Sequence, residues 1–372
     1  MKGSDVRGWQ TRRDHAVRRA LRVLASVETS SPVLTTTRRP ARFTTNDWSA
    51  VRRSDTSRDV MYRLPGDDRD HLPPSARQMW ARSSATTLRV AKMGEHASLR
   101  FRAFYLGSKA PSAVKVAVGP ESATRRIERE ITARREIGNR LPTPELLDVG
   151  EFNDGCYLVE ETTFGVHPST PAEKQNVALA LVDDLVAFHR EREVTDRRLD
   201  VHAATGERLE RLFATDWVHT QDASGPLDVP AMVAPIMEII ADDRSMPVGW
   251  GHGDLGFSNI ITTASGQPVI IDWEHAGEMP AVTDLTKLAV IAPNTRHVVD
   301  RILHQATADD IGGRPGRMPL ARQLAAVTVR ELSWWEGRRE RAAAAGRLGP
   351  FNRGVRRRFR LLARLIEADR VG

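Results

Sequence analysis

Alternating hydrophobic and polar positions predict a small β-rich region in the first half of the chain. From Thr87 onward, Gly, Ser and Pro separate three runs that are typical of short strands, TTLRVAKM, SLRFRAFYLG and SAVKVAVG. Because short connections join these runs, we expect three sequential antiparallel strands. A helix is predicted over Glu121–Arg140, directly after Pro120. Two further strands are predicted at ELLDVGEF and CYLVEE, joined by a turn at Asn153–Asp154–Gly155.

Helical spacing of apolar residues dominates beyond Pro171, as in EKQNVALALVDDLVAFHRE and most of the final hundred residues. The exception is Trp250–Gly277, where NIITT and PVIIDW flank Ala264–Ser265–Gly266–Gln267 as a small hairpin. These patterns predict an α+β fold. We expect a small lobe with a five-stranded antiparallel sheet and one helix, followed by a large, mostly helical lobe that carries the hairpin. No internal repeat is visible in the sequence.

The region before the first predicted strand is expected to be an extension. Within Gln10–Glu28, apolar residues at helical spacing predict an amphipathic helix that packs on the main body. The arginines of this stretch also imitate an organellar transit peptide, but acidic residues in and beside it disfavour that alternative. A Ser/Thr/Pro-rich connection follows. We therefore expect an N-terminal extension over 1–86, a small lobe over 87–162 and a helical lobe over 163–372.

Composition excludes several classes of protein. The chain has 372 residues, of which 40% are hydrophobic, so it can bury a sizeable core. Its single cysteine, Cys156, excludes a disulfide framework and a cysteine zinc site. No apolar run approaches the roughly 20 residues needed to cross a bilayer, and the start lacks the apolar core of a secretory signal. We expect a cytoplasmic protein without a membrane partner.

Positive charge is concentrated near the end of the chain. The net charge is +7, and Trp273–Gly372 contains 18 Lys and Arg residues against 11 Asp and Glu. Arg356, Arg360 and Arg364 lie at helical spacing beside apolar residues, so we expect the solvated face of a packed helix, with an anionic partner as the alternative. Aromatic residues are 6% of the chain and are not clearly interleaved with the arginine clusters, so no nucleic-acid partner is expected.

Ionisable and amide side chains gather around the predicted hairpin. Asp254 and Asn259 lie in the loop before it, and Asp272 ends its second strand. Phosphoryl transfer from a nucleotide requires these groups: a carboxylate that orients and deprotonates a hydroxyl, and hard oxygen ligands that hold Mg²⁺ against phosphates. Because a hairpin brings its ends together, Asn259 and Asp272 are predicted to share a metal ion.

The segment HGDLGFSN, His252 to Asn259, followed by IIDWE, Ile270 to Glu274, resembles the aminoglycoside phosphotransferase and choline kinase family. This resemblance covers roughly Thr87 to Leu332 and implies a protein-kinase-like bilobal fold. It implies that Asp254 is the catalytic base, that His252 braces the loop, and that Asn259 and Asp272 bind Mg²⁺. The segment after Asp272 leads almost directly into a predicted helix, which disfavours a protein kinase because it leaves no room for an activation loop.

The same resemblance implies a nucleotide site in the small lobe. Lys115, in SAVKVAV, matches the strand lysine that binds phosphates, and either Glu128 or Glu130 is its helix partner. Glu130 is favoured because it falls within the apolar stripe of the predicted helix. The phosphate-covering loop departs from the glycine-rich consensus, so Gly94, Ser98 and nearby backbone amides are its candidates. Adenine is expected to contact the backbone of the linker that consists of Glu160, Glu161 and Thr162. Gly165 follows this linker.

Two further residues match frequent features of the family without entering its active site. Asp284 is expected to cap a helix N-terminus, and His189 to be a core-edge or capping residue.

The predicted function is ATP-dependent phosphorylation of a hydroxyl on a small molecule, with Mg²⁺ as cofactor and GTP as the alternative donor. Polycationic acceptors require an acidic pocket, whereas the C-terminal region is basic, so a neutral or anionic acceptor such as a sugar, nucleoside or phosphorylated metabolite is favoured. The alternatives are an antibiotic resistance kinase, a choline or amino-alcohol kinase with an aromatic face from Trp250, Trp334 and Trp335, and a nucleotide-binding pseudokinase-like regulatory protein. The sequence leaves the oligomeric state open.

Overall fold

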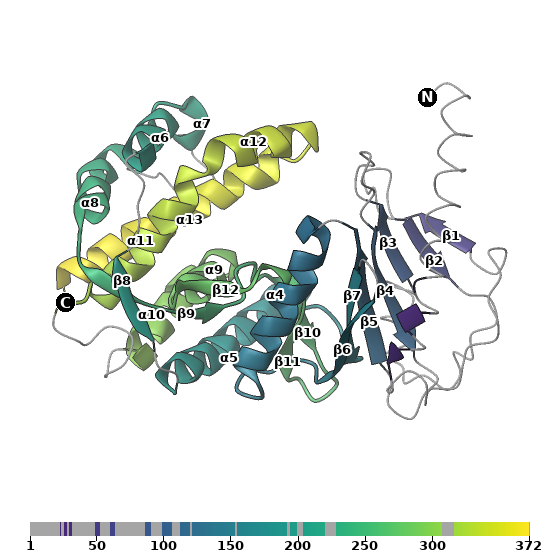
Figure 1. Cartoon of the computed structure of the whole chain (residues 1–372). Coiled ribbons are helices and arrows are strands. Elements are labelled where there is room, and N and C mark those ends of the chain that lie inside the picture. The colour runs from purple at the N-terminus through teal and green to yellow at the C-terminus, as the bar shows by residue number, and fades with distance from the viewer. Residues whose placement is uncertain are drawn as a thin grey trace, which may run out of the picture. The chain divides into compact units, whose positions relative to one another are not determined.

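The computed structural model divides the chain into two compact units (Figure 1). One consists of Met1–His167 and Ile260–His275, and the other of Pro168–Asn259 and Ala276–Gly372. The structure describes residues 23, 26–27, 30–31, 49–52, 60–63, 86–90, 99–105, 112–119, 121–152, 155–191, 194–198, 204–219, 228–306 and 316–371. No helix in these ranges is long and apolar enough to span a membrane.

An antiparallel sheet forms the centre of the first unit. Its strand order is β1-β2-β3-β4-β5-β7-β6. The strand bounds are Ser49–Arg52, Val60–Arg63, Thr86–Val90, Leu99–Tyr105 and Ser112–Val118 for β1 to β5, and Leu146–Phe152 and Gly155–Glu161 for β6 and β7. All five predicted strands are present, as β3 to β7. The sheet nevertheless has seven strands and not five, because β1 and β2 pair with each other and β2 pairs with β3. Each of these two strands is only four residues long, too short for a recognisable alternation in the sequence.

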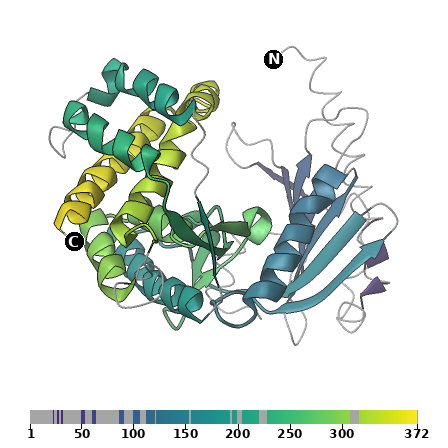
Figure 2. The ribbon, with the colours of Figure 1, turned by 60° about the vertical axis from the view of Figure 1, so that its left-hand side comes forward.

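The α4 helix (Glu121–Ile137) packs along the sheet of this unit (Figure 2). Buried Ala117, Ile127, Cys156 and Leu158 form the core between them. The helix was predicted to reach Arg140 but ends three residues earlier. Gly138 adopts a left-handed φ of 56°, a conformation that glycine accepts readily and that commonly ends helices.

The thiol of Cys156 is part of this core, with 3% of the residue exposed. Burial, reinforced by the negative charges of Glu128 and Glu151, raises its pKa to about 12. Since the thiolate is the reactive form of cysteine, this side chain acts as a small hydrophobic residue.

The predicted hairpin is present as β10 (Ile260–Thr262) and β11 (Pro268–Ile270) in the first unit. The segment after β7 pairs with it: the Val166 N–H donates to the Thr262 carbonyl at 3.0 Å, and the Thr262 N–H donates back at 2.8 Å. Gly165 makes this approach possible, because a Cβ there would lie 2.2 Å from the Thr262 carbonyl oxygen. The backbone contact therefore requires glycine.

Part of the predicted N-terminal amphipathic helix falls within the described residues. Val23, Ser26, Val27 and Ser30 are helical, and Val27 is fully buried, as a helix packed on the main body requires. Buried Ser31 donates a hydrogen bond to the Asp148 carboxylate of β6. The rest of the predicted helix lies outside the described residues.

Helices make up most of the second unit. Their bounds are Pro171–Arg190 (α5), Ala204–Phe213 (α6), Asp216–His219 (α7), Val229–Ala241 (α8), Thr283–Ile291 (α9), Thr295–Ala306 (α10), Leu320–Ser333 (α11), Trp335–Ala344 (α12) and Leu348–Val371 (α13). The helix α5 begins at a capping box in which Thr170 accepts from the Glu173 N–H, followed by Pro171 at the first helical position. His189, near the end of α5, is buried.

The helix α11 is the core of this unit, because almost all its residues are buried and α13 packs beside it (Figure 1). The predicted amphipathic character of α13 is confirmed: Phe359 and Leu362 are fully buried. Two of its arginines have partners within the chain: Arg356 donates to the Trp217 carbonyl at 3.3 Å, and Arg364 pairs with Asp300 at 3.0 Å.

A second sheet, absent from the prediction, accompanies these helices. Its order is β12-β9-β8, with bounds Gly277–Pro280, Ser245–Gly251 and Thr195–Arg198. The prediction of an almost wholly helical region beyond Pro171 was therefore wrong at these three strands. All four residues of β8 are polar and exposed, and β9 contains a proline and two glycines, so neither strand has a recognisable apolar alternation.

We predict that Gly165→Ala lowers the free energy of unfolding by about 1–3 kcal/mol, the usual cost of overpacking, because the added methyl group collides with the backbone of β10. Thermal or denaturant unfolding measures the change. Gly206→Ala in α6 is the matched control, since its nearest neighbour would lie 3.5 Å away. It should stabilise the protein by about 0.5–1 kcal/mol. Equal effects of the two substitutions would contradict the assigned contact.

Candidate active site

A buried lysine joins four segments of the first unit. The Lys115 ammonium, on β5, forms an ion pair with Glu130 of α4. It also lies 3.3 Å from Glu160 Oε1 at the end of β7 and 3.0 Å from Asp272 Oδ1 after β11. Only 9% of the lysine side chain is exposed. One cation therefore holds a strand, a helix and two loop entrances together.

Local structure explains why these side chains meet. Strand β5 is buried along its whole length and lies between β4 and β7, with Lys115 opposite Leu158 of β7. Glu130 lies on the buried face of α4 with 2% exposure, whereas Glu128 is exposed. Of the two glutamates left open by the sequence, Glu130 is the one that contacts Lys115.

Carboxylates outnumber cations among the described residues of this cluster. Arg134 Nη1 lies 3.2 Å from Glu160 Oε2, so two cations accompany three carboxylates. Burial raises the pKa of Glu130 above its ordinary value. Lys115 opposes this shift, while Glu160 and Asp272 add to it. The carboxylates therefore repel one another in a region of low solvent exposure.

Asp272 is the most accessible of these carboxylates, with 37% of its side chain exposed. Its backbone has a φ of 64°, and it is the only residue other than glycine with a positive φ in the described part of the chain. The next residue contributes to its placement, because the Trp273 N–H donates to Glu130 Oε1 at 3.3 Å. Left-handed backbone at a residue that is not glycine costs energy and is concentrated at functional sites.

The linker after β7 contains the residues predicted to meet adenine. The Glu161 N–H donates to the Glu145 carbonyl at 2.8 Å, and the Glu161 side chain is exposed. Thr162 is buried, and its hydroxyl has no hydrogen-bond partner among the described residues. Gly94 and Ser98, the predicted phosphate-loop residues, lie outside those residues.

The predicted catalytic loop lies in the second unit, between β9 and β10. His252 is 1% exposed, and its Nδ1 accepts a hydrogen bond from the Asp254 N–H at 3.2 Å. Asn259 Nδ2 donates to the Asp254 carbonyl oxygen at 2.8 Å. These bonds hold the backbone on both sides of Asp254 and leave its carboxylate exposed.

Asp284 and Lys287 of α9 anchor the same loop through hydrogen bonds to its backbone. The buried Asp284 carboxylate accepts from the His252 N–H at 2.6 Å and from the Gly253 N–H at 3.2 Å. The Lys287 ammonium donates to the Gly253 carbonyl. The prediction that Asp284 caps a helix was wrong: Val282 occupies the N-cap of α9 without a side-chain cap. The carboxylate binds the loop instead of the helix that carries it.

The sequence matches the family model of the phosphotransferase enzyme family over residues 95–320, which is more than half of the chain. The chain belongs to this family. A search of the curated proteins gives no match.

Several solved structures are similar to this phosphotransferase family member. A choline/ethanolamine kinase family protein from Mesorhizobium loti has a TM-score of 0.45 and 19% identity, covering 77% of this chain and 92% of that one. An aminoglycoside phosphotransferase from Alicyclobacillus acidocaldarius has a TM-score of 0.47 and 17% identity, covering 76% and 93%. A thermostable mutant of aminoglycoside phosphotransferase APH(4)-Ia, in a ternary complex with ADP and hygromycin B, has a TM-score of 0.38 and 16% identity, covering 76% and 98%.

Sequence reasoning missed Lys287 and did not predict the contacts of two residues that it had named, Glu160 and Asp284, in this phosphotransferase family member. The side chain of Glu160 belongs to the lysine cluster, although only the backbone there was predicted to matter. Asp284 and Lys287, one helical turn apart, both bind the backbone of the predicted catalytic loop: Asp284 accepts from the N–H groups of His252 and Gly253, and Lys287 donates to the Gly253 carbonyl. Their spacing on one face of α9 is a signal in the sequence, but the partner loop lies about thirty residues earlier and cannot be read from it.

We predict that Asp284→Ala lowers the free energy of unfolding by about 2–4 kcal/mol, because it removes the acceptor of the buried His252 N–H and of the partly buried Gly253 N–H. Hydrogen exchange should show faster exchange of these two amides. Glu340→Ala, at an exposed position of α12, is the control and should change stability by less than about 0.5 kcal/mol. Unchanged protection of both amides in Asp284→Ala would contradict the anchoring role.

Proposed function

We propose that this member of the phosphotransferase enzyme family transfers the γ-phosphate of ATP to a hydroxyl group of a small molecule. The observation that carries the proposal is the contact of one buried ammonium, Lys115, with both Glu130 and Asp272. In nucleotide-dependent phosphotransferases a lysine held by a helix glutamate aligns the phosphates, and a nearby carboxylate binds the metal ion. GTP is the alternative donor.

The nucleotide is assigned to the first unit. Lys115 would bind the phosphates, with Glu130 and Glu160 fixing the position of its ammonium. The linker over residues 160–162 would contact adenine through its backbone. The buried Thr162 hydroxyl supports this assignment, because a polar atom without a partner at the end of a strand calls for one.

The residues of the cluster fit a magnesium ion. No group of three or more His, Cys, Asp or Glu side chains that could hold a metal ion occurs in the described ranges. Mg²⁺ does not need such a group, because it uses one or two protein oxygens together with water and substrate phosphates. Asp272 offers a carboxylate whose side chain is 37% exposed, and a divalent cation would reduce the repulsion among the neighbouring carboxylates. We assign Asn259 as the second ligand from its position directly before β10.

When bound, Mg²⁺ neutralises charge on the transferred phosphoryl group. The chain itself contributes the positions of the reacting groups. Asp254 would accept the proton of the acceptor hydroxyl as its oxygen bonds to the γ-phosphorus. The bond from that phosphorus to the β,γ-bridging oxygen breaks, and ADP leaves. His252, Asp284 and Lys287 would act through the loop backbone, holding Asp254 without touching the substrate.

We predict that Asp254→Ala lowers the turnover number about 10²–10⁴-fold, the usual contribution of a general base, while nucleotide affinity stays within a factor of two. A coupled assay of ADP formation against a panel of sugars, nucleosides, amino alcohols and antibiotics measures turnover, and calorimetry measures ATP binding. Asp243→Ala, an exposed surface carboxylate, is the control with unchanged activity. Near-normal turnover by the Asp254 variant would remove it as the base.

Asp272→Asn is expected to raise the Mg²⁺ concentration needed for half-maximal turnover more than about tenfold, because it removes the charged ligand. Asn tolerates left-handed backbone, so the substitution separates metal binding from backbone strain. Glu274→Gln, which changes a carboxylate that lies 3.2 Å from Arg126 Nη1 and 3.4 Å from His275 Nε2, is the control. An unchanged Mg²⁺ titration would exclude Asp272 as a ligand.

A further inference from the structure

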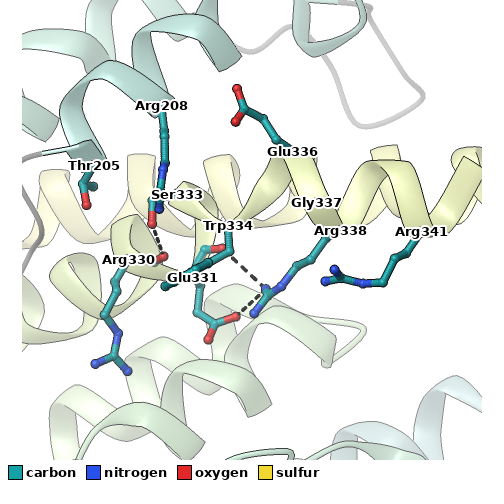
Figure 3. Close-up of a pocket in the computed structure, with 10 residues that line it drawn as sticks. All are labelled: Thr205, Arg208, Arg330, Glu331, Ser333, Trp334, Glu336, Gly337, Arg338 and Arg341. Atoms are coloured by element: carbon teal, nitrogen blue, oxygen red, sulfur yellow. Dashed lines mark hydrogen bonds and ion pairs between the residues drawn. The ribbon is translucent and has the colours of Figure 1, made fainter. Parts of the chain in front are cut away.

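A cavity of about 640 Å³ lies in the second unit, lined by residues of α6, α11 and α12 and by Trp334 between the last two (Figure 3). Its volume suits a small molecule, since ligand pockets are commonly about 300–1,000 Å³. Six of its lining residues are charged: Arg208, Arg330, Arg338, Arg341, Glu331 and Glu336. The cavity shares its unit with the loop that carries Asp254.

Internal ion pairs satisfy both of these carboxylates. Glu331 Oε2 lies 2.7 Å from Arg338 Nη1, and Glu336 Oε1 lies 2.6 Å from Nε of Arg211, which does not line the cavity. Figure 3 shows Arg338 and Arg341 extending from α12 in the same direction, while Glu336 points away from them. Three arginines, Arg208, Arg330 and Arg341, therefore remain in the lining without a paired carboxylate among the described residues.

Among these three arginines, Arg330 is the one whose charge is least stable when no anion is bound. Its side chain is partly buried, and no ion pair to it exists in the described part of the chain. Burial lowers the pKa of its guanidinium, and the charge of neighbouring Glu331 offsets this only in part. A desolvated cation without a counterion costs stability, and an anionic ligand would remove that cost.

The surroundings disfavour a cationic acceptor. Trp334 is 51% exposed, but the Arg208 guanidinium lies over its ring at 5.2 Å from the centroid. A choline-like ammonium would have to replace an arginine already in place and would meet the charges of Arg330 and Arg341. Trp335 is buried, with its Nε1 donating to the Arg208 carbonyl at 2.9 Å, so it offers no open ring face.

The side chains of Glu331 and Lys287 connect the cavity wall to the catalytic loop. Helix α9 packs against α11, and Lys287 of α9 donates to the Gly253 carbonyl, next to Asp254. Burial opposes ionisation of Glu331, but Arg338, then Lys287 and Arg358, outweigh it and hold the pKa of Glu331 below its ordinary value. Glu331 of the cavity wall is thus within electrostatic reach of the lysine that contacts the loop.

We propose that this cavity binds the anionic group of the phosphoryl acceptor, a small hydroxy compound that carries a phosphate ester or a carboxylate. Arg330 binds the anion, Arg341 adds positive charge to the same cavity, and Trp334 with its stacked Arg208 forms one wall. This inference rests on the proposed function, because it assigns the cavity to that reaction's acceptor. Guanidinium groups suit both oxyanions, which they bind through paired N–H donors.

Anion binding is tested first without catalysis. Inorganic phosphate and malonate, titrated separately into the full-length protein by calorimetry without nucleotide, represent the two anion classes. We expect binding of at least one anion to be more than tenfold weaker in Arg330→Met and in Arg341→Glu. Arg357→Met, an exposed arginine of α13, is the matched control and should bind as the wild type. Lys115→Met separates the cavity from the nucleotide site. If Lys115→Met loses anion binding while the two cavity variants keep it, the inference is overturned.

Turnover then tests the role of the anion in the acceptor. Glycerol, glycerol phosphate and glycerate differ in one charged group, and ADP formation with each gives kcat and KM. We expect kcat/KM to be at least tenfold higher for one of the charged compounds. Arg330→Met should raise its KM about tenfold with little change in kcat. Preference for neutral or amino-alcohol acceptors, with no effect of Arg330→Met, would overturn the inference and leave the proposed function standing. If phosphate binding depends on the arginines but no hydroxyl compound is phosphorylated, two proposals are overturned: the transfer to a hydroxyl acceptor and the binding of that acceptor in the cavity.

Stability separates a binding arginine from a structural one. Because Arg330 is partly desolvated and has no ion pair with any described residue, Arg330→Met should leave the Tm unchanged or raise it while anion binding is lost. A lower Tm would mean that Arg330 serves the fold and would overturn its role. Arg341→Glu, at an exposed position, keeps the test valid if Arg330→Met does not fold.

Discussion

The first unit depends on the burial of one positive charge. The Lys115 ammonium has too little contact with water to be stable without counterions, so the carboxylates of Glu130, Glu160 and Asp272 must approach it. That requirement fixes the rotation of α4 on the sheet, the end of β7 and the path of the chain after β11. It also explains why Asp272 tolerates a left-handed backbone: the ion pair and the Trp273 amide bond hold it in place.

In the second unit, a buried negative charge has the corresponding role. There a buried carboxylate, Asp284, accepts from consecutive backbone amides, and Lys287 one turn later donates to a carbonyl of the same loop. Both groups come from the first turns of α9, whose remaining residues pack into the helical core. The loop therefore inherits the rigidity of the core, while the Asp254 side chain stays in solvent. Such support suits a group that must be oriented before it meets its partner.

The sequence predicted the parts of this molecule that depend on local periodicity and on motif spacing. Strands β3 to β7, α4 and the hairpin follow from alternation and turn residues, and the roles proposed for Asp254 and Asp272 were inferred from their positions around that hairpin. What could not be predicted depends on contacts distant in the chain. The exposed β8 strand exists only because β9 pairs with it, and Asp284 has its role only because α9 packs under the loop. The arginine cavity combines α6 with α11 and α12, more than a hundred residues away, which no local pattern encodes.

The burial of Cys156 has a practical consequence for spectroscopy. It is the only cysteine in the sequence, and its thiol is almost entirely protonated at neutral pH because its pKa is about 12. The thiolate is the form that attacks maleimide reagents, so the folded protein behaves toward them as if it had no cysteine. A cysteine introduced at an exposed position can therefore carry a fluorophore without replacement of Cys156. The same protection makes Cys156 a built-in reporter: its modification would signal that α4 has separated from the sheet.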